Sequence, residues 1–179
     1  MMVEAFLKYI QTHKLFQKNH TILVGVSGGV DSVTLCDLLY HAGFNFAVAH
    51  CNFGLRGSES DADDIFTESL AQNYSVPYFK QYFNTKKEAE EKGISIQMAA
   101  RDLRFKWFEQ VRAENDYHAI AVATHHDDSI ETFFINLLRG TGLKGLTGIK
   151  PEQNRIVRPL LFASRADIEE YARSTGYAW

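Results

Sequence analysis

The chain has 179 residues, which suffice for one well-buried domain but are short for two. Hydrophobic residues make up 45% and charged residues 23%, as in ordinary globular proteins, and no apolar run is long enough to span a membrane. The net charge of −3 argues against a protein that binds nucleic acid through its overall charge.

Local charge, the cysteines and the N-terminal segment further restrict the class of protein to which the chain can belong. Residues 139–165 carry six basic side chains and one acidic side chain, so we expect a polyanion to meet the protein there. Cys36 and Cys51 form no Cys-x-x-Cys pattern, which argues against a disulfide framework or a four-thiolate metal site. The first residues lack the layout of a signal peptide. We therefore expect a cytoplasmic protein with two buried thiols.

The first elements in chain order are a helix, a strand and a second helix. Residues 3–16 have apolar side chains at helical spacing and predict an amphipathic helix. The β-branched run 21–26 predicts a buried strand, and apolar positions return at helical spacing from 31 to 39. Between these two segments, Gly28 and Gly29 predict a tight turn.

The glycine turn predicts a phosphate site. Adjacent glycines allow positive φ and let successive N–H groups point into one concavity, to which the helix adds its positive end. Ser27 and Ser32 can donate further hydrogen bonds. Asp31 would repel a phosphate unless a cation lay between them, so we expect Mg²⁺ at this carboxylate. The spacing fits neither a P-loop nor a dinucleotide fingerprint, and an unliganded glycine turn is the alternative.

The hexapeptide of this turn resembles the PP-loop of the ATP pyrophosphatase superfamily. These enzymes cleave ATP between its α and β phosphates and adenylate a substrate. The resemblance implies an α/β fold of the adenine nucleotide alpha hydrolase type, which is Rossmann-like: an open, mostly parallel, twisted sheet with helices on both faces. It implies that ATP is bound by Ser27, Gly28, Gly29, Val30, Asp31 and Ser32.

A second buried strand is predicted over residues 45–50, followed by a loop to Gly57. Parallel strands present ligand-binding groups at their carboxyl ends, so His50 and Asn52 are candidates for the nucleotide site. The alternatives are a histidine that closes the strand and an asparagine that makes a turn.

A long helix, capped by Ser95, is predicted from 96 to about 114. Arg101 and Arg104 share one face of it, so that two guanidinium groups could reach one phosphate or carboxylate; surface salt bridges are the alternative. The elements before this helix are predicted as an acidic helix over 58–74, a strand over 77–83 and a charged helical turn or loop over 85–93.

A fourth strand over 118–123 leads into His125, His126, Asp127 and Asp128, ahead of a helix predicted over 129–139. So many titratable groups at a strand end favour a functional turn. A dinuclear metal site suits the ligand types, but zinc spacing is missing. For Asp128, a helix N-cap is the structural alternative. The remaining elements are predicted as a flexible glycine-rich loop over 140–148, a strand over 156–161 and a helix over 164–175, all within one domain spanning residues 1–179.

Several blocks in order resemble the tRNA(Ile)-lysidine synthetases. These blocks are Ser27–Ser32, His50–Arg56, Ala100–Phe105, His125–Thr132, Leu137–Gly142 and Arg158–Leu161.

The resemblance implies a ligase that uses ATP to adenylate the C2 carbonyl oxygen of the first anticodon cytidine in an isoleucine tRNA, after which the ε-amine of free lysine displaces AMP. Asp31 would hold Mg²⁺ or assist proton transfer, while Arg104, His125 and Asp127 would orient phosphates, base or lysine. The implied cofactors are ATP and Mg²⁺, the implied partners are isoleucine tRNA and lysine, and a homodimer stays open.

The chain departs from the family pattern at Phe53, where many relatives have histidine, and at Phe105, where they have tyrosine. His126 matches a variable position, which leaves His125 as the functional imidazole. Relatives usually continue into basic RNA-binding domains, so residues 1–179 are expected to be a fragment that lacks them and binds tRNA poorly. Alternatives are another PP-loop tRNA-modifying or adenylating enzyme, a nucleotide-binding module without turnover, and a metal phosphoesterase.

Overall fold

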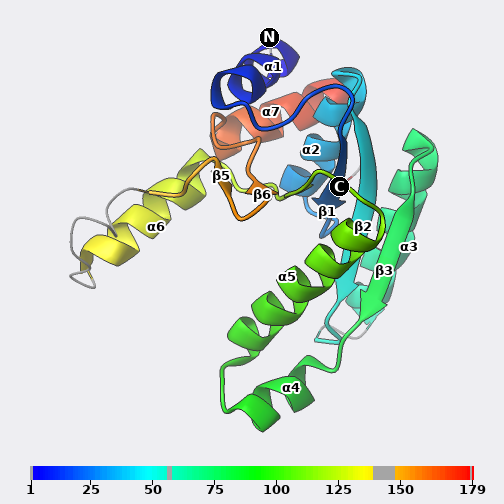
Figure 1. The fold of residues 1–179 in the computed structure, drawn as a ribbon, viewed down its shortest axis with the longest axis vertical. Coiled ribbons are helices and arrows are strands. Elements are labelled where there is room, and N and C mark those ends of the chain that lie inside the picture. Colours follow the sequence, from blue (N-terminus) through cyan, green and yellow to red (C-terminus); the bar gives the residue numbers. More distant parts are fainter. Residues whose placement is uncertain (1, 56–57, 139–147, 178) are drawn as a thin grey trace.

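The structure, a computed structural model, describes residues 2–55, 58–138, 148–177 and 179. Within these residues the chain forms a six-stranded sheet in the order β3-β2-β1-β4-β6-β5 (Figure 1). The strands are β1 (Thr21–Gly25), β2 (Asn45–Asn52), β3 (Tyr78–Tyr82), β4 (Ala119–Ala121), β5 (Glu152–Gln153) and β6 (Ile156–Val157). The helices are α1 (Met2–His13), α2 (Val30–His41), α3 (Ser58–Tyr74), α4 (Thr85–Lys92), α5 (Ile96–Glu114), α6 (His126–Leu138) and α7 (Arg165–Thr175).

The sheet is parallel except at its edge, where β5 pairs antiparallel with β6. Its centre is β1, whose Ile22, Leu23 and Val24 are fully buried because helices cover both faces. One face packs against α1, α2, α3 and α7, and the other against Phe108 and Val111 of α5. The expected open, mostly parallel α/β sheet with helices on both faces is confirmed.

The strand order reverses direction next to β1, because the chain crosses from β1 outward to β2 and β3 and later returns to β4 on the other side. In open α/β sheets, ligands bind at such a switch point, outside the carboxyl ends of the strands. The loop after β1 and the turn after β4 therefore meet at one edge.

Helix α7 packs against α2 and is held there by hydrogen bonds to buried polar side chains of α2. Asp37 is 5% exposed and accepts hydrogen bonds from Tyr171 of α7 at 2.7 Å and from Tyr74 of α3 at 3.0 Å. Thr34 and Tyr177 join their hydroxyls at 2.5 Å, one turn earlier on α2. These contacts fix the position of α7 along α2, and hence that of Arg165 at its start.

Some predicted boundaries were wrong. The strand predicted over 156–161 is only two residues long, and it pairs with β5, which the sequence did not predict. Helix α6 begins at His126 rather than 129. The predicted glycine-rich loop over 140–148 lies outside the described residues except for Gly148, as do Arg56 and Gly57 of the earlier loop. No helix in the described part of the chain combines the length and apolar character needed to cross a membrane.

Candidate active site

The glycine loop joins β1 to α2 and has the conformation that its glycines allow. Gly28 has φ +91°, a value that favours glycine, and Gly29 is extended and begins the helix without a side-chain cap. The Ser32 hydroxyl donates to the carbonyl of Gly29 at 2.9 Å and accepts the Ser27 N–H at 3.2 Å. These hydrogen bonds hold the loop in shape and leave the first turn of α2 open to a ligand.

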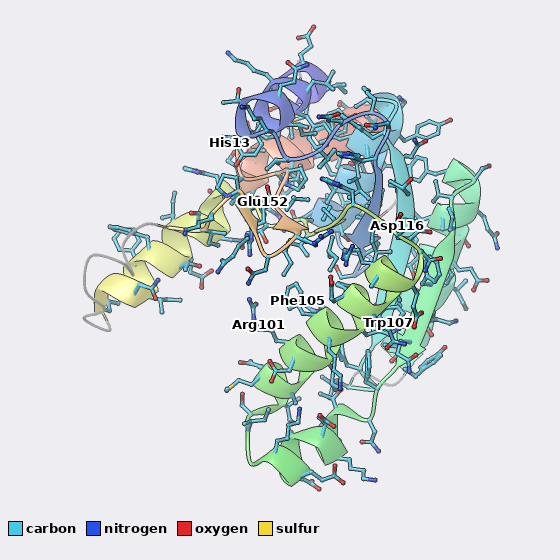
Figure 2. All side chains as sticks on the ribbon, viewed as in Figure 1. His13, Arg101, Phe105, Trp107, Asp116 and Glu152 are labelled. Atoms are coloured by element: carbon cyan, nitrogen blue, oxygen red, sulfur yellow. The ribbon has the colours of Figure 1, made fainter. Side chains whose placement is uncertain are left out.

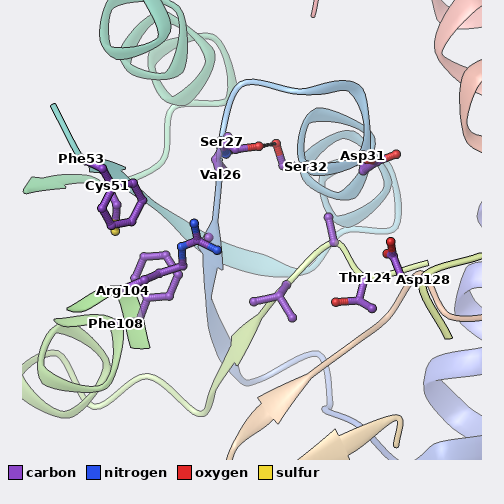
Figure 3. Close-up of a pocket in the computed structure, with 13 residues that line it drawn as sticks. Val26, Ser27, Asp31, Ser32, Cys51, Phe53, Arg104, Phe108, Thr124 and Asp128 are labelled. Carbon is purple, nitrogen blue, oxygen red and sulfur yellow. Dashed lines mark hydrogen bonds between the residues drawn. The ribbon is translucent and has the colours of Figure 1, made fainter. Parts of the chain in front are cut away.

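A cavity of about 260 Å³ lies against this loop. Figure 3 shows Phe53 and Arg104 on one side of it, and Asp31 and Asp128 on the other. The loop residue Ser27 lies between the two sides. The cavity therefore has one cationic wall and one acidic wall.

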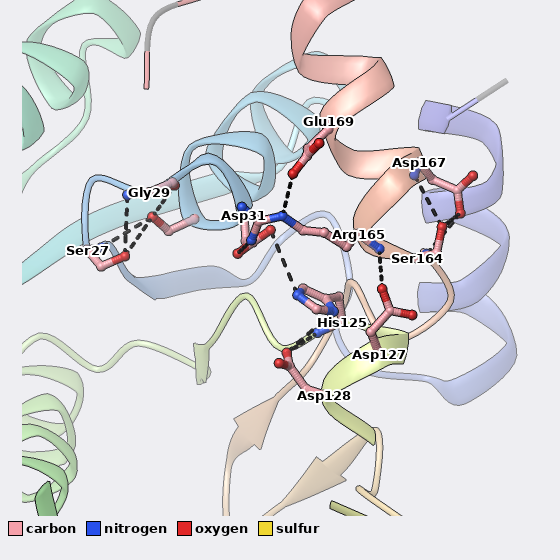
Figure 4. A network of polar contacts seen from close by, with 11 residues as sticks. Ser27, Gly29, Asp31, His125, Asp127, Asp128, Ser164, Arg165, Asp167 and Glu169 are labelled. Atoms are coloured by element: carbon pink, nitrogen blue, oxygen red, sulfur yellow. Dashed lines mark hydrogen bonds and ion pairs between the residues drawn. The ribbon is translucent and has the colours of Figure 1, made fainter. Parts of the chain in front are cut away.

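Asp31 is the central group of the acidic wall (Figure 4). Its Oδ2 accepts a hydrogen bond from Arg165 Nη1 at 2.7 Å, and its Oδ1 lies 4.0 Å from His125 Nε2. Burial raises the pKa of Asp31, although the charges of Arg165 and His125 act in the opposite direction. Asp31 Oδ1 is buried and has no hydrogen-bond partner among the described residues, so it is available to a ligand.

His125 is 8% exposed and lies between Asp31 and Asp128. Its backbone N–H donates to Asp128 Oδ2 at 2.9 Å, and its Nδ1 lies 3.6 Å from the same oxygen. Asp128 therefore lies in the first turn of α6 and reaches back to the residue before the helix, rather than serving as the N-cap itself. The carboxylate of Asp128 therefore fixes the backbone of the turn, while Nδ1 of the imidazole is buried and forms no hydrogen bond with a described residue.

Asp127 has a different environment from Asp128. Its Oδ2 accepts the backbone N–H of Arg165 at 2.8 Å, which ties the turn after β4 to the start of α7. The side chain of Asp127 is not among those that line the cavity, whereas that of Asp128 is. Of these two neighbouring carboxylates, the structure brings Asp128 to the cavity.

Arg104 projects from α5 toward the glycine loop (Figure 3). Its guanidinium lies 5.1 Å from the centre of the Phe53 ring, and no carboxylate among the described residues pairs with it. Burial is the main cause that lowers the pKa of Arg104, and the charge of Arg101 adds to it. A half-buried guanidinium without a carboxylate partner is available to an anion.

His50 and Asn52 lie behind the loop and are each 4% exposed. His50 Nδ1 is 2.8 Å from the carbonyl oxygen of Val26, and its Nε2 is 3.1 Å from Asp64 Oδ1. Asn52 donates to Asp64 Oδ2 at 3.2 Å and accepts the Gly54 N–H at 2.9 Å, so it makes the turn that its residue type suggests. The contacts of both residues support the loop from behind, and both also line a second cavity.

The family model of the PP-loop domain matches residues 2–179. The chain belongs to the PP-loop domain family. The glycine loop, with Asp31 and Ser32 in the first turn of α2, is the PP-loop of this domain.

Curated relatives agree with this assignment, and a solved structure shares the fold. The PP-loop domain is 47% identical over 176 residues to a tRNA(Ile)-lysidine synthase from Bacteroides thetaiotaomicron, a match that covers 98% of this chain and 41% of the relative. A tRNA(Ile)-lysidine synthase from Parabacteroides distasonis is 45% identical, with 99% and 41% covered. The chain thus spans about two fifths of the length of these curated relatives. A U34-tRNA thiolase from Methanococcus maripaludis, solved with its [4Fe-4S] cluster, has the same fold, with a TM-score of 0.76, 19% identity, and 98% and 64% covered.

Arg165 is the residue of this PP-loop domain that sequence reasoning missed. A cation in the first turn of a helix opposes the helix dipole, so an arginine directly after the capping residue Ser164 signals an acidic partner. Its partners are Asp31 and Glu169, the latter at 2.9 Å from Nε. The sequence around Arg165 predicts only Glu169 as an ion-pair partner, because Asp31 lies 134 residues away along the chain.

The structure gives less support to thiol chemistry and to a dinuclear metal site. Burial raises the pKa of the Cys51 thiol to about 12 and raises that of Cys36 as well, so neither is a ready thiolate. Within the described ranges, no three His, Cys, Asp or Glu side chains converge as protein ligands of a metal ion would. A dinuclear site at the turn after β4 therefore has no set of ligands there.

Proposed function

We propose that this PP-loop domain is the catalytic part of a tRNA(Ile)-lysidine synthase, cytoplasmic like its substrate. It would ligate lysine to C2 of the first anticodon cytidine of an isoleucine tRNA, with ATP converted to AMP and diphosphate. The observation that carries the proposal is the meeting of Asp31 and His125, 4.0 Å apart, beside the PP-loop. The names of the relatives at 45–47% identity support it.

The reaction has two steps. First, O2 of the cytidine attacks the α phosphorus of ATP, and the bond to the β-phosphate oxygen breaks. Next, the ε-amine of lysine attacks C2, the C2–O bond breaks, and AMP leaves as the nitrogen loses a proton. Adenylation is needed because a carbonyl oxygen is a poor leaving group.

The residues of the two walls suit these two steps. The free N–H groups at the start of α2 would hold the departing diphosphate, and Arg104 would stabilise charge on the phosphate under attack. His125, whose backbone N–H is held by Asp128, would take the proton from the amine. Asp127 would act indirectly, by holding the turn against α7.

The residues present fit a magnesium ion. Asp31 Oδ1 is a buried carboxylate oxygen without a hydrogen-bond partner among the described residues, and Mg²⁺ in phosphate-transferring sites is held by one or two carboxylates together with substrate phosphates. Asp31 would hold it. When bound, the ion would neutralise charge on the diphosphate.

Residues 1–179 would form a single catalytic domain, and most of the tRNA affinity would come from a part of the protein outside this span. The chain matches only 41% of each of the two relatives. A net charge of −3 is too acidic for strong contact with many phosphates.

The test is to incubate the protein with ATP, lysine and an excess of isoleucine tRNA. The tRNA is then digested, and the masses of its nucleosides are measured. We expect the mass of one cytidine to increase by that of lysine less water. His125→Ala should reduce the rate by at least about a hundredfold. His126→Ala is the matched control, because His126 is the exposed neighbouring imidazole, and it should retain most of the activity.

Two other outcomes would point elsewhere. ATP binding without a modified nucleoside, at any tRNA concentration, would indicate a nucleotide-binding module. Sulfur on the tRNA would indicate a thiolase, an outcome that the raised pKa values of both cysteines argue against.

A further inference from the structure

The PP-loop begins with the peptide unit that joins Val26 to Ser27. A peptide unit is planar and trans, so its carbonyl oxygen and its N–H point in opposite directions. The N–H of Ser27 donates to Ser32 Oγ at 3.2 Å, and Ser32 lines the cavity beside the loop. The carbonyl oxygen of Val26 therefore points to the other side of the loop, away from the first turn of α2.

The orientation of this peptide unit decides what the PP-loop presents to an anion. If the unit were turned over, the Val26 carbonyl oxygen would point toward the first turn of α2, which has no side-chain cap. The partial negative charge of that oxygen would repel a phosphate, whereas N–H groups attract it. Gly28 and Gly29 resist such a rotation only weakly, because glycine accepts both signs of φ. The orientation is therefore best fixed from outside the loop.

His50 fixes it from β2. Its Nδ1 lies 2.8 Å from the carbonyl oxygen of Val26, and because a carbonyl oxygen only accepts, Nδ1 carries the hydrogen that joins them. The residue is 4% exposed, so water does not compete for this hydrogen bond. His50 thus holds the carbonyl end of the peptide unit, while Ser32 holds its N–H end.

Asp64 holds the ring of His50 in place. Its Oδ1 lies 3.1 Å from His50 Nε2. Burial raises the pKa of Asp64, but hydrogen bonds from Tyr82 and Asn52 and nearby positive charges lower it more, so Asp64 is ionised at neutral pH. The contact with an ionised carboxylate is attractive when Nε2 also carries a hydrogen, which makes an imidazolium beside a carboxylate. A half-turn of the ring would lose the contacts at both nitrogens.

The end of β3 anchors Asp64 in turn. The Tyr82 hydroxyl donates to Asp64 Oδ2, and Lys80 Nζ lies 3.7 Å from the same oxygen. This end of the strand is itself supported by α5, because the Phe83 ring lies 6.3 Å from the Trp107 ring at an interplanar angle of 77°. Figure 2 shows Trp107 on the side of α5 that faces β3. A continuous set of polar contacts therefore runs from the edge of the sheet to the first peptide unit of the PP-loop.

We propose that His50 and Asp64 are positioning residues for the diphosphate of ATP. They hold the Val26 carbonyl oxygen away from the anion site, so that the N–H groups of the PP-loop face the ligand, and neither residue touches the diphosphate itself. The inference rests on the proposed function only in taking ATP as the ligand of the loop. Loss of either contact should weaken the binding of phosphate groups and leave the binding of the nucleoside unchanged.

The probes are inorganic diphosphate, adenosine and α,β-methylene-ATP, each titrated into the chain with Mg²⁺ and followed by NMR. His50→Leu replaces the ring by an apolar side chain and removes the donor to Val26. We expect it to weaken diphosphate and the ATP analogue about tenfold and to leave adenosine unchanged. Equal weakening of diphosphate and adenosine would overturn the proposal, because it would indicate a general loss of structure.

His50→Gln is the matched conservative variant, because its amide nitrogen can donate to the same carbonyl oxygen. It should restore most of the diphosphate affinity that His50→Leu loses. If the two variants bind diphosphate equally well, the hydrogen bond to Val26 does not position the loop.

Tyr82→Phe tests the network at its exposed end, where the fold tolerates a change, since Tyr82 is 56% exposed. It removes the hydroxyl that donates to Asp64 and should weaken diphosphate roughly threefold. Tyr74→Phe is the matched control, because its hydroxyl also donates to a buried aspartate, Asp37 at 3.0 Å, which lies farther along α2 from the PP-loop. It should bind diphosphate as the wild type does. Wild-type affinity in Tyr82→Phe, or an equal loss in both variants, would contradict the assignment.

The two proposals fail in different ways. If the wild-type chain binds neither diphosphate nor the ATP analogue, the proposed function fails, and this inference fails with it. If the wild-type chain binds both and the variants of His50 and Tyr82 bind them as tightly, only this inference fails. A chain that responds to the variants as expected but transfers no lysine would contradict the proposed function and leave the positioning roles standing.

Discussion

The polar network behind the PP-loop and the polar network in front of it are built differently. Behind the loop, Asp64 is 4% exposed and is contacted by His50, Asn52, Tyr82 and Lys80. In front of the loop, Arg165 is 45% exposed at its side chain, and an oxygen of Asp31 has no hydrogen-bond partner among the described residues. Oδ1 of Asp64 also forms no hydrogen bond with a described residue, but it lies 3.1 Å from His50 Nε2 in a buried position, whereas Asp31 lines the cavity. The rear network therefore supports the fold, and the front network is the one that a ligand can reach.

The largest effect on stability is expected from Asp64→Asn, which removes the charge at the centre of the rear network. The carboxylate that joins β2, β3 and α3 would lose its charge, and the free energy of unfolding should fall by about 3 kcal/mol. Urea denaturation followed by circular dichroism measures it. Asp63→Asn, at the neighbouring but cavity-facing carboxylate, is the matched control and should cost less than about 1 kcal/mol.

Gly28 lies where the two networks meet, and Gly28→Ala comes next. A side chain at φ +91° is strained, so we expect a loss of about 2 kcal/mol in unfolding free energy and weaker ATP binding. Gly29→Ala is the control, because Gly29 has φ −75° and a Cβ there would lie at an ordinary 3.6 Å from Ser27 Oγ. Equal destabilisation by both variants would show that the conformation of Gly28 is not what matters.

Arg165→Gln breaks the front network. Asp31 loses the guanidinium that orients it, so the rate of the proposed lysine transfer should fall about tenfold. The unfolding free energy should change by less than about 1 kcal/mol, since the pair is partly exposed. Arg165→Lys should restore part of the rate. Arg173→Gln is matched to it, because Arg173 also pairs with Glu169 but not with Asp31, and it should have wild-type activity.

The smallest effect is a pH dependence of stability from the rear network. Burial raises the pKa of Asp64, but the hydrogen bonds of Tyr82 and Asn52 and the charges of His50 and Lys80 outweigh it, so the pKa is lower than normal. A lowered pKa in the folded state stabilises the protein above the unfolded value near 3.9, and this stability is lost as pH falls through the folded value. Between pH 5 and pH 3, wild-type stability should therefore fall more steeply than that of Asp64→Asn.

The central fold could be predicted because its signals are local. The strand 21–26, the glycine turn and the helix after it have strong periodicity, and they correspond to β1, the PP-loop and α2. The edge of the sheet could not be predicted, because β5 and β6 have two residues each and so carry no pattern.

The candidate site likewise has one part that could be predicted from the sequence and one part that could not. His125 could be placed beside Asp31 because both follow parallel strands of one sheet. The partnership of Arg165 with Asp31 joins residues 134 apart, and that of His50 with Asp64 depends on how α3 packs against β2. Neither leaves a periodic trace in the sequence.

The attachment of α7 to α2 through Asp37 and Tyr171 has a consequence for the order of assembly. Helix α7 is synthesised after every strand of the sheet, so the sheet and PP-loop can form on the ribosome while Asp31 still lacks Arg165. The nascent protein would thus have its PP-loop before Asp31 is paired. Docking of α7 would then bring Arg165 to Asp31 and complete the acidic wall of the cavity.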